Sequence, residues 1–283
     1  MAQLIDGRAI SNKIKSYVKI EVENLRKSGI GICLAVVLVG SDPASKVYVK
    51  NKRIACEKVG IISKEILLDE KISQNELISI INDLNRDSEI NGILVQLPLP
   101  KQLNENKVIN SIDPIKDVDA FCPINVGKIM IGKYDFLPCT PAGVLDLIDS
   151  TGVDICGKNC VVIGRSNIVG KPMAMLLLHR SGTVTVCHSR TKNLEKFTQN
   201  ADILVSAVGI ANFVGASMVR PGSVVIDVGI NRAQNGKLCG DVDFESVKEI
   251  AGYITPVPGG VGPMTIAKLM ENTLKAAKIQ NSI

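Results

Sequence analysis

The sequence predicts an α/β protein of two domains separated by a cleft. At 283 residues the chain is too long for one small core, so two domains of a hundred-odd residues each are expected. In both halves, apolar strand-like runs alternate with amphipathic helical stretches. Such alternation indicates parallel sheets covered by helices, because parallel strands need long crossover connections.

The first half is expected to contain three helices and three strands. Periodicity places helices at residues 8–27, 45–60 and 73–85, and strands at 32–40, 62–68 and 92–100. Ser28 and Gly29 end the first helix. Ser73, with Glu76 three residues later, predicts a capping box at the start of the third helix.

The middle of the chain, residues 98–141, is expected to form loops and a crossing between the domains. Its periodicity weakens while proline and glycine become frequent. A second alternating series follows, with a short helix at 141–150, strands near 160–163, 183–188, 203–207, 223–228 and 252–254, and a last helix from residue 264. That last helix can pack on either domain.

Composition excludes several classes of protein. No apolar run approaches the roughly 18 residues that a membrane span needs, and the amino-terminal residues lack a basic and then apolar leader, so a soluble, unprocessed protein is expected. The net charge of +5 is mild and aromatic residues make up only 3% of the chain, so nucleic acid is not an expected partner. A small anionic ligand and a solvated surface explain the positive charge equally well.

The eight cysteines indicate neither disulfides nor a metal site. Apart from Cys156 and Cys160 they are scattered singly, and His179 and His188 are the only histidines in the sequence. Cys187 and His188 are adjacent on an expected strand, so they point to opposite faces and do not form a nucleophile and base. Reduced thiols of a cytosolic protein are expected, and no metal.

The segment "VVIGRSNIVGKP", residues 161–172, reads as a strand, a glycine turn and a helix. In this arrangement free backbone N–H groups and a helix N-terminus meet a pyrophosphate. It departs from the GxGxxG pattern, because Gly164 is followed by Ser166 and the later glycine is Gly170. The surrounding strands and helices favour dinucleotide binding over a purely structural turn.

The end of the next strand indicates which dinucleotide. NAD-binding domains usually place an acidic residue there, whereas this chain has "HSRT", residues 188–191. Ser189 and Arg190, helped by Arg165, can hold a 2′-phosphate, which favours NADP over NAD. The alternative is that these residues only form a solvated basic strand end, which leaves the choice between NADP and NAD open.

A lysine on the apolar side of the second helix is the least expected feature of the first half. A turn of about 100° per residue puts Tyr48, Lys52 and Val59 in one arc, with Lys50 and Arg53 opposite. One interpretation has the Lys52 stem along the core edge with its ammonium in water. The other has the ammonium in a cleft, where burial lowers its pKa and fits it to move protons or orient water.

Three further segments have candidate ligand-binding residues. Gln96 follows the strand of "GILVQLPLP" at the end where open α/β sheets bind ligands. The segment "KDVDAF" has Asp117 and Asp119, for which turn formation is the alternative role. In "YITPVPGGVGPMT", residues 253–265, prolines restrict the backbone and glycines allow close approach to a ligand.

Together these motifs resemble the bifunctional methylenetetrahydrofolate dehydrogenase/methenyltetrahydrofolate cyclohydrolase family over essentially the whole chain. The matching motifs, in order, are "YVKNK", "GILVQLPLP", "KDVDAF", "NVGK", "PCTPAG", "VVIGRSNIVGKP", "AVG", "VVIDVGIN", "GDVDF" and "YITPVPGGVGPMT". The resemblance implies NADP-dependent oxidation of 5,10-methylenetetrahydrofolate to the 5,10-methenyl form and its hydrolysis to 10-formyltetrahydrofolate. It implies a cytoplasmic homodimer in one-carbon metabolism and purine biosynthesis. A formate-linked ligase activity would need a longer chain, so none is expected.

The resemblance also implies a domain division. An N-terminal α/β catalytic domain that binds folate comprises residues 1–139 and is completed by the helix at 264–283. A Rossmann-like NADP-binding domain with a parallel sheet comprises residues 140–263.

The resemblance implies roles for individual residues. Lys52 matches the lysine central to the hydrolysis, Gln96 the glutamine that holds it, Tyr48 the aromatic residue packed on the folate, and Asp119 the carboxylate that grips the pterin. The cofactor contacts are matched by Gly164, Arg165, Ser166, Ser189 and Ile230, and the substrate loop by Pro258, Gly259 and Gly260. The family has glycine where this chain has Ala120, so a positive φ there would strain the Asp119 loop.

Two other functions fit parts of the sequence. A different NADP dehydrogenase would act on a small hydroxy or amino acid, yet the sequence offers no histidine and acid pair of the usual kind and leaves "PGGVGPMT" without a role. A non-catalytic NADP sensor is the other possibility, and it predicts that Lys52 is dispensable.

Overall fold

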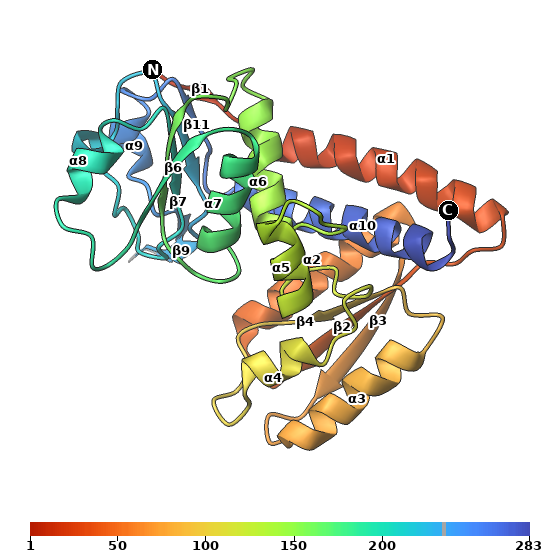
Figure 1. Ribbon diagram of the computed structural model, residues 1–283. Helices are drawn as coiled ribbons and strands as arrows, with labels where there is room; N and C mark the ends of the chain where they lie inside the picture. Colours follow the sequence, from red (N-terminus) through yellow and green to blue (C-terminus); the bar gives the residue numbers. More distant parts are fainter. Residues whose placement is uncertain (234–235) are drawn as a thin grey trace. The chain divides into compact units, whose positions relative to one another are not determined.

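The computed structural model describes residues 1–233 and 236–283, which form two compact units. Unit 1 comprises Met1–Asn12 and Thr140–Thr265, and unit 2 comprises Lys13–Cys139 and Ile266–Ile283. Two long helices, α1 (Gly7–Lys27) and α10 (Val261–Gln280), contribute residues to both units (Figure 1). Within the described residues, no helix is long and apolar enough to cross a membrane.

Unit 2 contains a three-stranded parallel sheet in the order β3-β2-β4. The strands are β2 (Cys33–Val39), β3 (Ile62–Leu68) and β4 (Gly92–Val95). Every residue of the central strand β2 is buried, because a parallel strand is covered on both faces. Three parallel strands are therefore confirmed, but the strand expected at 92–100 is shorter than predicted, because it ends at Val95, before the prolines at 98 and 100.

Helix α3 (Gln74–Arg86) covers one face of this sheet (Figure 1). Its apolar stripe, Leu77, Ile81 and Leu84, packs against the side chains of β2 and β4 that point to that face. The predicted capping box is confirmed, because Ser73 Oγ accepts from Glu76 N at 3.2 Å and Glu76 Oε2 accepts from Ser73 N at 3.0 Å. Helix α2 (Pro43–Val59) packs against β2 and β3.

The expectation of loops throughout residues 98–141 is wrong, because the segment also forms two short helices. These are α4 (Glu105–Asn110) and α5 (Pro123–Met130). Asn104 Oδ1 caps α4 by accepting from Lys107 N at 3.1 Å, and Pro123 occupies the first turn of α5. Both helices are too short to show a clear helical period in the sequence.

Unit 1 contains a six-stranded sheet in the order β1-β11-β8-β7-β5-β6, with every pair parallel. The strands are β1 (Gln3–Leu4), β5 (Asn159–Ile163), β6 (Thr183–Cys187), β7 (Ile203–Ser206), β8 (Val224–Asp227) and β11 (Tyr253–Ile254). A separate antiparallel pair is made by β9 (Asn231–Arg232) and β10 (Leu238–Cys239).

The helices of unit 1 connect these strands. They are α6 (Cys139–Asp149), α7 (Gly170–His179), α8 (Leu194–Thr198), α9 (Phe244–Val247) and the 3-10 helix η1 (Ala216–Met218). Helix α7 packs on β5 and β6, as the crossover of a parallel pair does.

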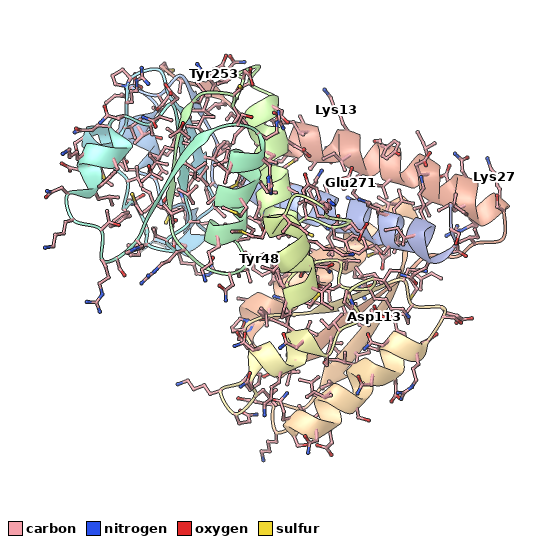
Figure 2. The ribbon with its side chains drawn as sticks, in the orientation of Figure 1. Lys13, Lys27, Tyr48, Asp113, Tyr253 and Glu271 are labelled. Carbon is pink, nitrogen blue, oxygen red and sulfur yellow. The ribbon has the colours of Figure 1, made fainter. Side chains whose placement is uncertain are left out.

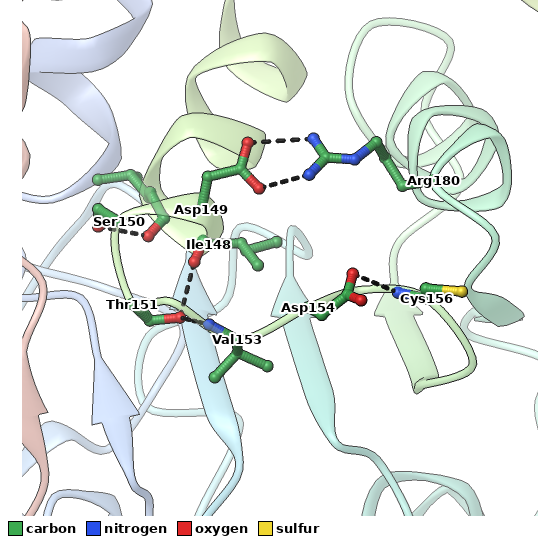
Figure 3. A network of polar contacts seen from close by, with 9 residues as sticks. Ile148, Asp149, Ser150, Thr151, Val153, Asp154, Cys156 and Arg180 are labelled. Atoms are coloured by element: carbon green, nitrogen blue, oxygen red, sulfur yellow. Dashed lines mark hydrogen bonds and ion pairs between the residues drawn. The ribbon is translucent and has the colours of Figure 1, made fainter.

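Polar contacts hold the chain where α6 ends (Figure 3). Thr151 Oγ1 donates to Ile148 O at 2.7 Å and accepts from Val153 N at 3.2 Å. Asp149 forms a two-pronged ion pair with Arg180, which follows α7, at 2.7 and 3.0 Å. Both side chains are exposed, so this pair orients α6 and α7 more than it stabilises them.

Candidate functional site

Lys52 lies on the buried face of α2. Asp42 Oδ2 caps this helix by accepting from Ser45 N at 2.7 Å, and Gly60 ends it in the left-handed conformation. On the buried face of this helix Lys52 is only 9% exposed. Tyr48, one turn earlier and labelled in Figure 2, is 38% exposed and lies at the margin of that face. Lys50 and Arg53 are not buried, as the helical period predicts.

The Lys52 ammonium is held by Gln96. Lys52 Nζ donates to Gln96 Oε1 at 2.9 Å. Gln96 is placed by the sheet, because its N–H donates to Val37 O at 2.9 Å, and its Nε2 donates to Leu97 O at 2.8 Å, which turns Oε1 toward the lysine. The interpretation in which the ammonium reaches water is therefore wrong.

Burial and Asp119 act in opposite directions on Lys52. Burial lowers the pKa of Lys52, and the nearby Asp119 carboxylate opposes this by favouring the charged ammonium. Burial likewise raises the pKa of Asp119, and the charge of Lys52 opposes that rise. A buried amine and a carboxylate that perturb each other are typical of a site that moves protons.

The segment that contains Asp119 is fixed by its neighbours. Asp117 Oδ2 accepts from Cys122 N at 2.8 Å and from Asn125 Nδ2 at 3.0 Å, so Asp117 has the turn-forming role named as its alternative. Ala120 has φ 57°, in the left-handed region. The conditional expectation for this position is thus met, and the left-handed backbone costs alanine about 1 to 2 kcal/mol.

Two residues beside Asp119 were not identified from the sequence. Cys139 is buried, and burial raises the pKa of its thiol well above the ordinary value, so the thiol is protonated. Asn272 on α10 donates to Val118 O at 2.8 Å and Leu137 O at 2.9 Å, and thereby holds together the segments that precede Asp119 and Cys139. The only sequence signal for Cys139 is its place in the motif "PCTPAG".

In unit 1, the glycine turn after β5 has room for glycine alone. Gly164 has φ 125°, and a Cβ there would lie 2.4 Å from Ala207 O. At Gly170 a Cβ would lie 2.3 Å from Gly164 O, so the two ends of the turn pack directly on each other. This close packing brings the N-terminus of α7 to the end of β5, where phosphates bind in such folds.

Ser166 replaces a glycine of the usual pattern and stabilises the turn. Its Oγ accepts from Val169 N at 3.1 Å and from Gly170 N at 3.3 Å. Ser166 and Arg165 are both exposed, so their side chains are accessible to a ligand.

The predicted cofactor residues after β6 lie next to this turn. Strands β5 and β6 are paired and parallel, and Gly164 N donates to Cys187 O at 2.9 Å. His188 Nδ1 accepts from Arg190 N at 3.1 Å, which shapes the strand end and leaves Ser189 and Arg190 exposed. The turn and the basic strand end therefore form one candidate anion site.

The glycine loop of residues 256–263 lines a small cavity in unit 1. The cavity measures about 120 Å³ and also has Ile230, Asp227 and Arg8 in its walls. Gly259 has φ 118°, and a Cβ on Gly7 would lie 1.9 Å from Gly260 O. The structure thus brings Pro258, Gly259 and Gly260 together with Ile230, while helix α10 begins at Val261, before Pro263.

These features define the class of protein. A parallel sheet with a glycine turn and a basic neighbouring strand end is a dinucleotide-binding fold, and the buried Lys52 beside the partly buried Gln96 and Asp119 is typical of an enzyme active site. Residues 5–119 match the family "Tetrahydrofolate dehydrogenase/cyclohydrolase, catalytic domain", and residues 138–281 match its "NAD(P)-binding domain". The chain belongs to the tetrahydrofolate dehydrogenase/cyclohydrolase family.

Known relatives agree over the whole chain. The "Bifunctional protein FolD" of Acetivibrio thermocellus is 62% identical over 99% of this chain and 98% of its own. The crystal structure of the bifunctional FolD enzyme of Campylobacter jejuni is 52% identical, covers 100% of both chains and has a TM-score of 0.98. The Trypanosoma brucei enzyme, solved with NADP and an inhibitor, is 37% identical, covers 100% of this chain and 99% of its own, and has a TM-score of 0.96.

Proposed function

We propose that this chain oxidises 5,10-methylenetetrahydrofolate to the 5,10-methenyl form with NADP and hydrolyses that product to 10-formyltetrahydrofolate. Family membership and relatives described as methylenetetrahydrofolate dehydrogenase/cyclohydrolase support both reactions. The observation that carries the proposal is the buried Lys52 ammonium, 2.9 Å from Gln96 Oε1 and under the influence of Asp119.

The hydrolysis needs polar groups that orient water and move protons. Lys52 Nζ is the group proposed for this work, because burial makes its proton easier to lose while Asp119 keeps the ammonium available. Gln96 orients Nζ through its amide oxygen. Asp119 binds the pterin, and the exposed ring of Tyr48 packs against the folate.

The oxidation needs positioning more than acid or base catalysis. NADP, when bound, supplies the hydride acceptor. Gly164 and Ser166 present the turn and helix N-terminus to the pyrophosphate, and Ser189 with Arg165 binds the 2′-phosphate. The absence of a carboxylate in "HSRT" supports NADP over NAD.

Two further contacts complete the proposed binding residues. Ile230 contacts the cofactor, and Pro258, Gly259 and Gly260 form the substrate loop, whose glycines let a ligand approach the backbone. We also propose the division into a folate-binding domain, residues 1–139 with 264–283, and an NADP-binding domain, residues 140–263. The compact units differ from this division chiefly at Met1–Asn12, which belong to unit 1 because β1 pairs with β11 there.

We further propose that the protein acts in the cytoplasm as a homodimer. The eight cysteines are all free in the described structure, which suits a reducing compartment. Sedimentation equilibrium tests the dimer, and a monomer at micromolar concentration would contradict it.

A turnover assay tests the function. The purified protein is given 5,10-methylenetetrahydrofolate with NADP or NAD, and NADPH or NADH formation is followed by absorbance. Decay of the methenyl form is measured separately without dinucleotide. Activity in both assays with a preference for NADP is expected, whereas oxidation without hydrolysis contradicts the role of Lys52, and NADP binding without either reaction indicates a sensor.

A further inference from the structure

Asp241 is a buried carboxylate for which the proposed chemistry has no use. It lies in "GDVDF" with 0% of its surface exposed. Its oxygens accept hydrogen bonds from three consecutive backbone N–H groups: those of Val208 at 2.7 Å, Gly209 at 3.2 Å and Ile210 at 3.0 Å. Successive N–H groups that converge in this way form a site for an anion. Here the anion is a side chain of the protein itself.

Asp241 also holds the next loop along the sheet. Its Oδ1 accepts from Asn231 Nδ2 at 3.0 Å, and its Oδ2 accepts from Ser206 Oγ at 3.3 Å. All of these partners donate to it, so both oxygens act as acceptors, as in an ionised carboxylate. One side chain therefore ties the loop after β7 to the loop after β8.

Each of these loops touches a proposed cofactor-binding element. The loop after β7 begins at Ala207, whose carbonyl would be 2.4 Å from a Cβ on Gly164 of the glycine turn. The loop after β8 contains Ile230, directly before Asn231. Both loops leave the carboxyl ends of parallel strands, where open α/β sheets bind ligands.

A second buried carboxylate, that of Asp227, fixes the backbone of Asp241. Asp227 Oδ1 accepts from Asp241 N and from Gly229 N, both at 2.9 Å. A Cβ on Gly229 would lie 2.2 Å from Asp241 Oδ1, so the loop after β8 closes directly onto the carboxylate. Asp241 has little freedom to move.

We infer that Asp241 is a positioning residue for the dinucleotide: its carboxylate fills a backbone anion site after β7 and holds the two loops that contact the cofactor. The inference rests on the proposed function. The filled site also rejects cofactor phosphates, because its N–H groups are already used, and so directs them to the turn at Gly164.

Asp241→Ala tests this inference, because it removes the carboxylate and leaves space for formate. The KM and the calorimetric Kd for NADP are expected to rise about tenfold or more, the usual cost of losing several charge-assisted hydrogen bonds. Hydrolysis of the methenyl form, measured without dinucleotide, is expected to persist. Added sodium formate, compared with sodium chloride at equal ionic strength, is expected to restore much of the NADP affinity.

Two further variants distinguish positioning from general damage. Asp241→Asn keeps the side-chain volume, so the same rise in Kd is expected without rescue by formate. Asp243→Asn removes a charge two residues away, where the side chain makes no helix-capping hydrogen bond, and wild-type values are expected. If Asp241→Ala does not fold, the Kd of Asp241→Asn for NADP is the test. A raised Kd supports the positioning role, and an unchanged Kd contradicts it.

The outcomes separate the inference from the function. An unchanged Kd for NADP in both Asp241 variants, or a rise in Asp241→Ala that formate does not reduce, overturns the positioning role. Absence of turnover by the wild-type protein removes the proposed function, while the comparison of Kd values still reports on Asp241.

Discussion

Lys52 illustrates how one side chain acquires a chemical role from its surroundings. A lysine on a helix surface is ordinarily solvated and charged. Here α2 presents it to the interior, Gln96 accepts its hydrogen bond at 2.9 Å, burial lowers its pKa, and the Asp119 carboxylate opposes that shift. A neutral side chain of similar length would retain the packing and lose the proton.

Lys52→Met is therefore expected to lower the rate of methenyltetrahydrofolate hydrolysis at least about a hundredfold, the usual contribution of general acid and base catalysis. NADP binding is expected to persist, because its proposed residues lie in unit 1. The measurement combines methenyl decay by absorbance with NADP titration calorimetry. Lys50→Met, on the exposed side of the same helix, is the control and should hydrolyse normally. Near-normal hydrolysis by Lys52→Met would remove the assignment.

Ala120 provides a test of backbone strain. Its φ of 57° costs about 1 to 2 kcal/mol for alanine, which glycine avoids. Glycine in turn loses a buried methyl group and adds chain entropy to the unfolded state, together of similar size. Ala120→Gly is therefore expected to change the free energy of unfolding by less than about 0.5 kcal/mol.

The matched control is Ala55→Gly, at a buried position inside α2. This substitution also loses a buried methyl group and adds chain entropy to the unfolded state, but it relieves no backbone strain. A decrease of about 1.5 kcal/mol in the free energy of unfolding is therefore expected. Urea unfolding curves measure both values. Equal destabilisation by the two substitutions would show that Ala120 is unstrained.

Helix ends were predictable where their signals are local. The capping box of α3 needs only Ser73 and Glu76, three residues apart, and both of its hydrogen bonds form. The left-handed end of α2 at Gly60 follows the same logic. Helices α4 and α5 each have only one local signal, a capping residue before α4 and a proline at the start of α5, and both helices are short. One such signal does not distinguish a short helix from a loop.

Ser73→Ala is expected to lower the free energy of unfolding by about 1 kcal/mol, because the first turn of α3 loses its capping acceptor. Ser79→Ala, at an exposed position inside the same helix, is the control, and a small gain is expected because alanine is the better helix former. Chemical unfolding followed by far-ultraviolet circular dichroism compares them. If the cap contributes nothing, the unfolding curves of Ser73→Ala and Ser79→Ala will superimpose.

The whole molecule should have an unusual pH response through Asp227. Burial raises the pKa of Asp227 to about 6 in the folded protein, above its ordinary value of 3.8. Between these values the folded state binds more protons than the unfolded state, so the contribution of Asp227 to stability falls as the pH rises. Below both pKa values the contribution of Asp227 to the free energy of unfolding is complete, and a pKa shift of this magnitude makes it about 3 kcal/mol.

Asp227→Asn removes this titration. As the pH falls from 7.5 to 5, the wild-type protein is expected to gain stability relative to Asp227→Asn, by about 1.3 kcal/mol. Urea unfolding of both proteins at several pH values gives the difference. If that difference stays constant over the range, Asp227 does not bind a proton more tightly in the folded state.

The local and the long-range parts of the site differ in how far the sequence predicts them. Buried strands, helix ends and the glycine turn arise from neighbours along the chain, and their patterns indicate them directly. The helical period indicated Lys52 and the end of a strand indicated Gln96, but only the resemblance to a family paired them, because their hydrogen bond joins residues 44 positions apart. Neither route gave a role to Asp241, whose three backbone N–H donors lie 31 to 33 positions away, or to Asn272, 154 positions from Val118.

The sequence by itself determined two alternating α/β series, the turn that can cradle a pyrophosphate and a lysine on the inward face of its helix. Only the tertiary structure decided how deeply that lysine is buried, that Asp241 fills the amide site after β7, and that Asn272 holds the chain around Cys139. The reason is physical. Periodicity and capping depend on a few neighbouring residues, whereas the surroundings of a buried polar group are set by segments that meet only when the chain has folded.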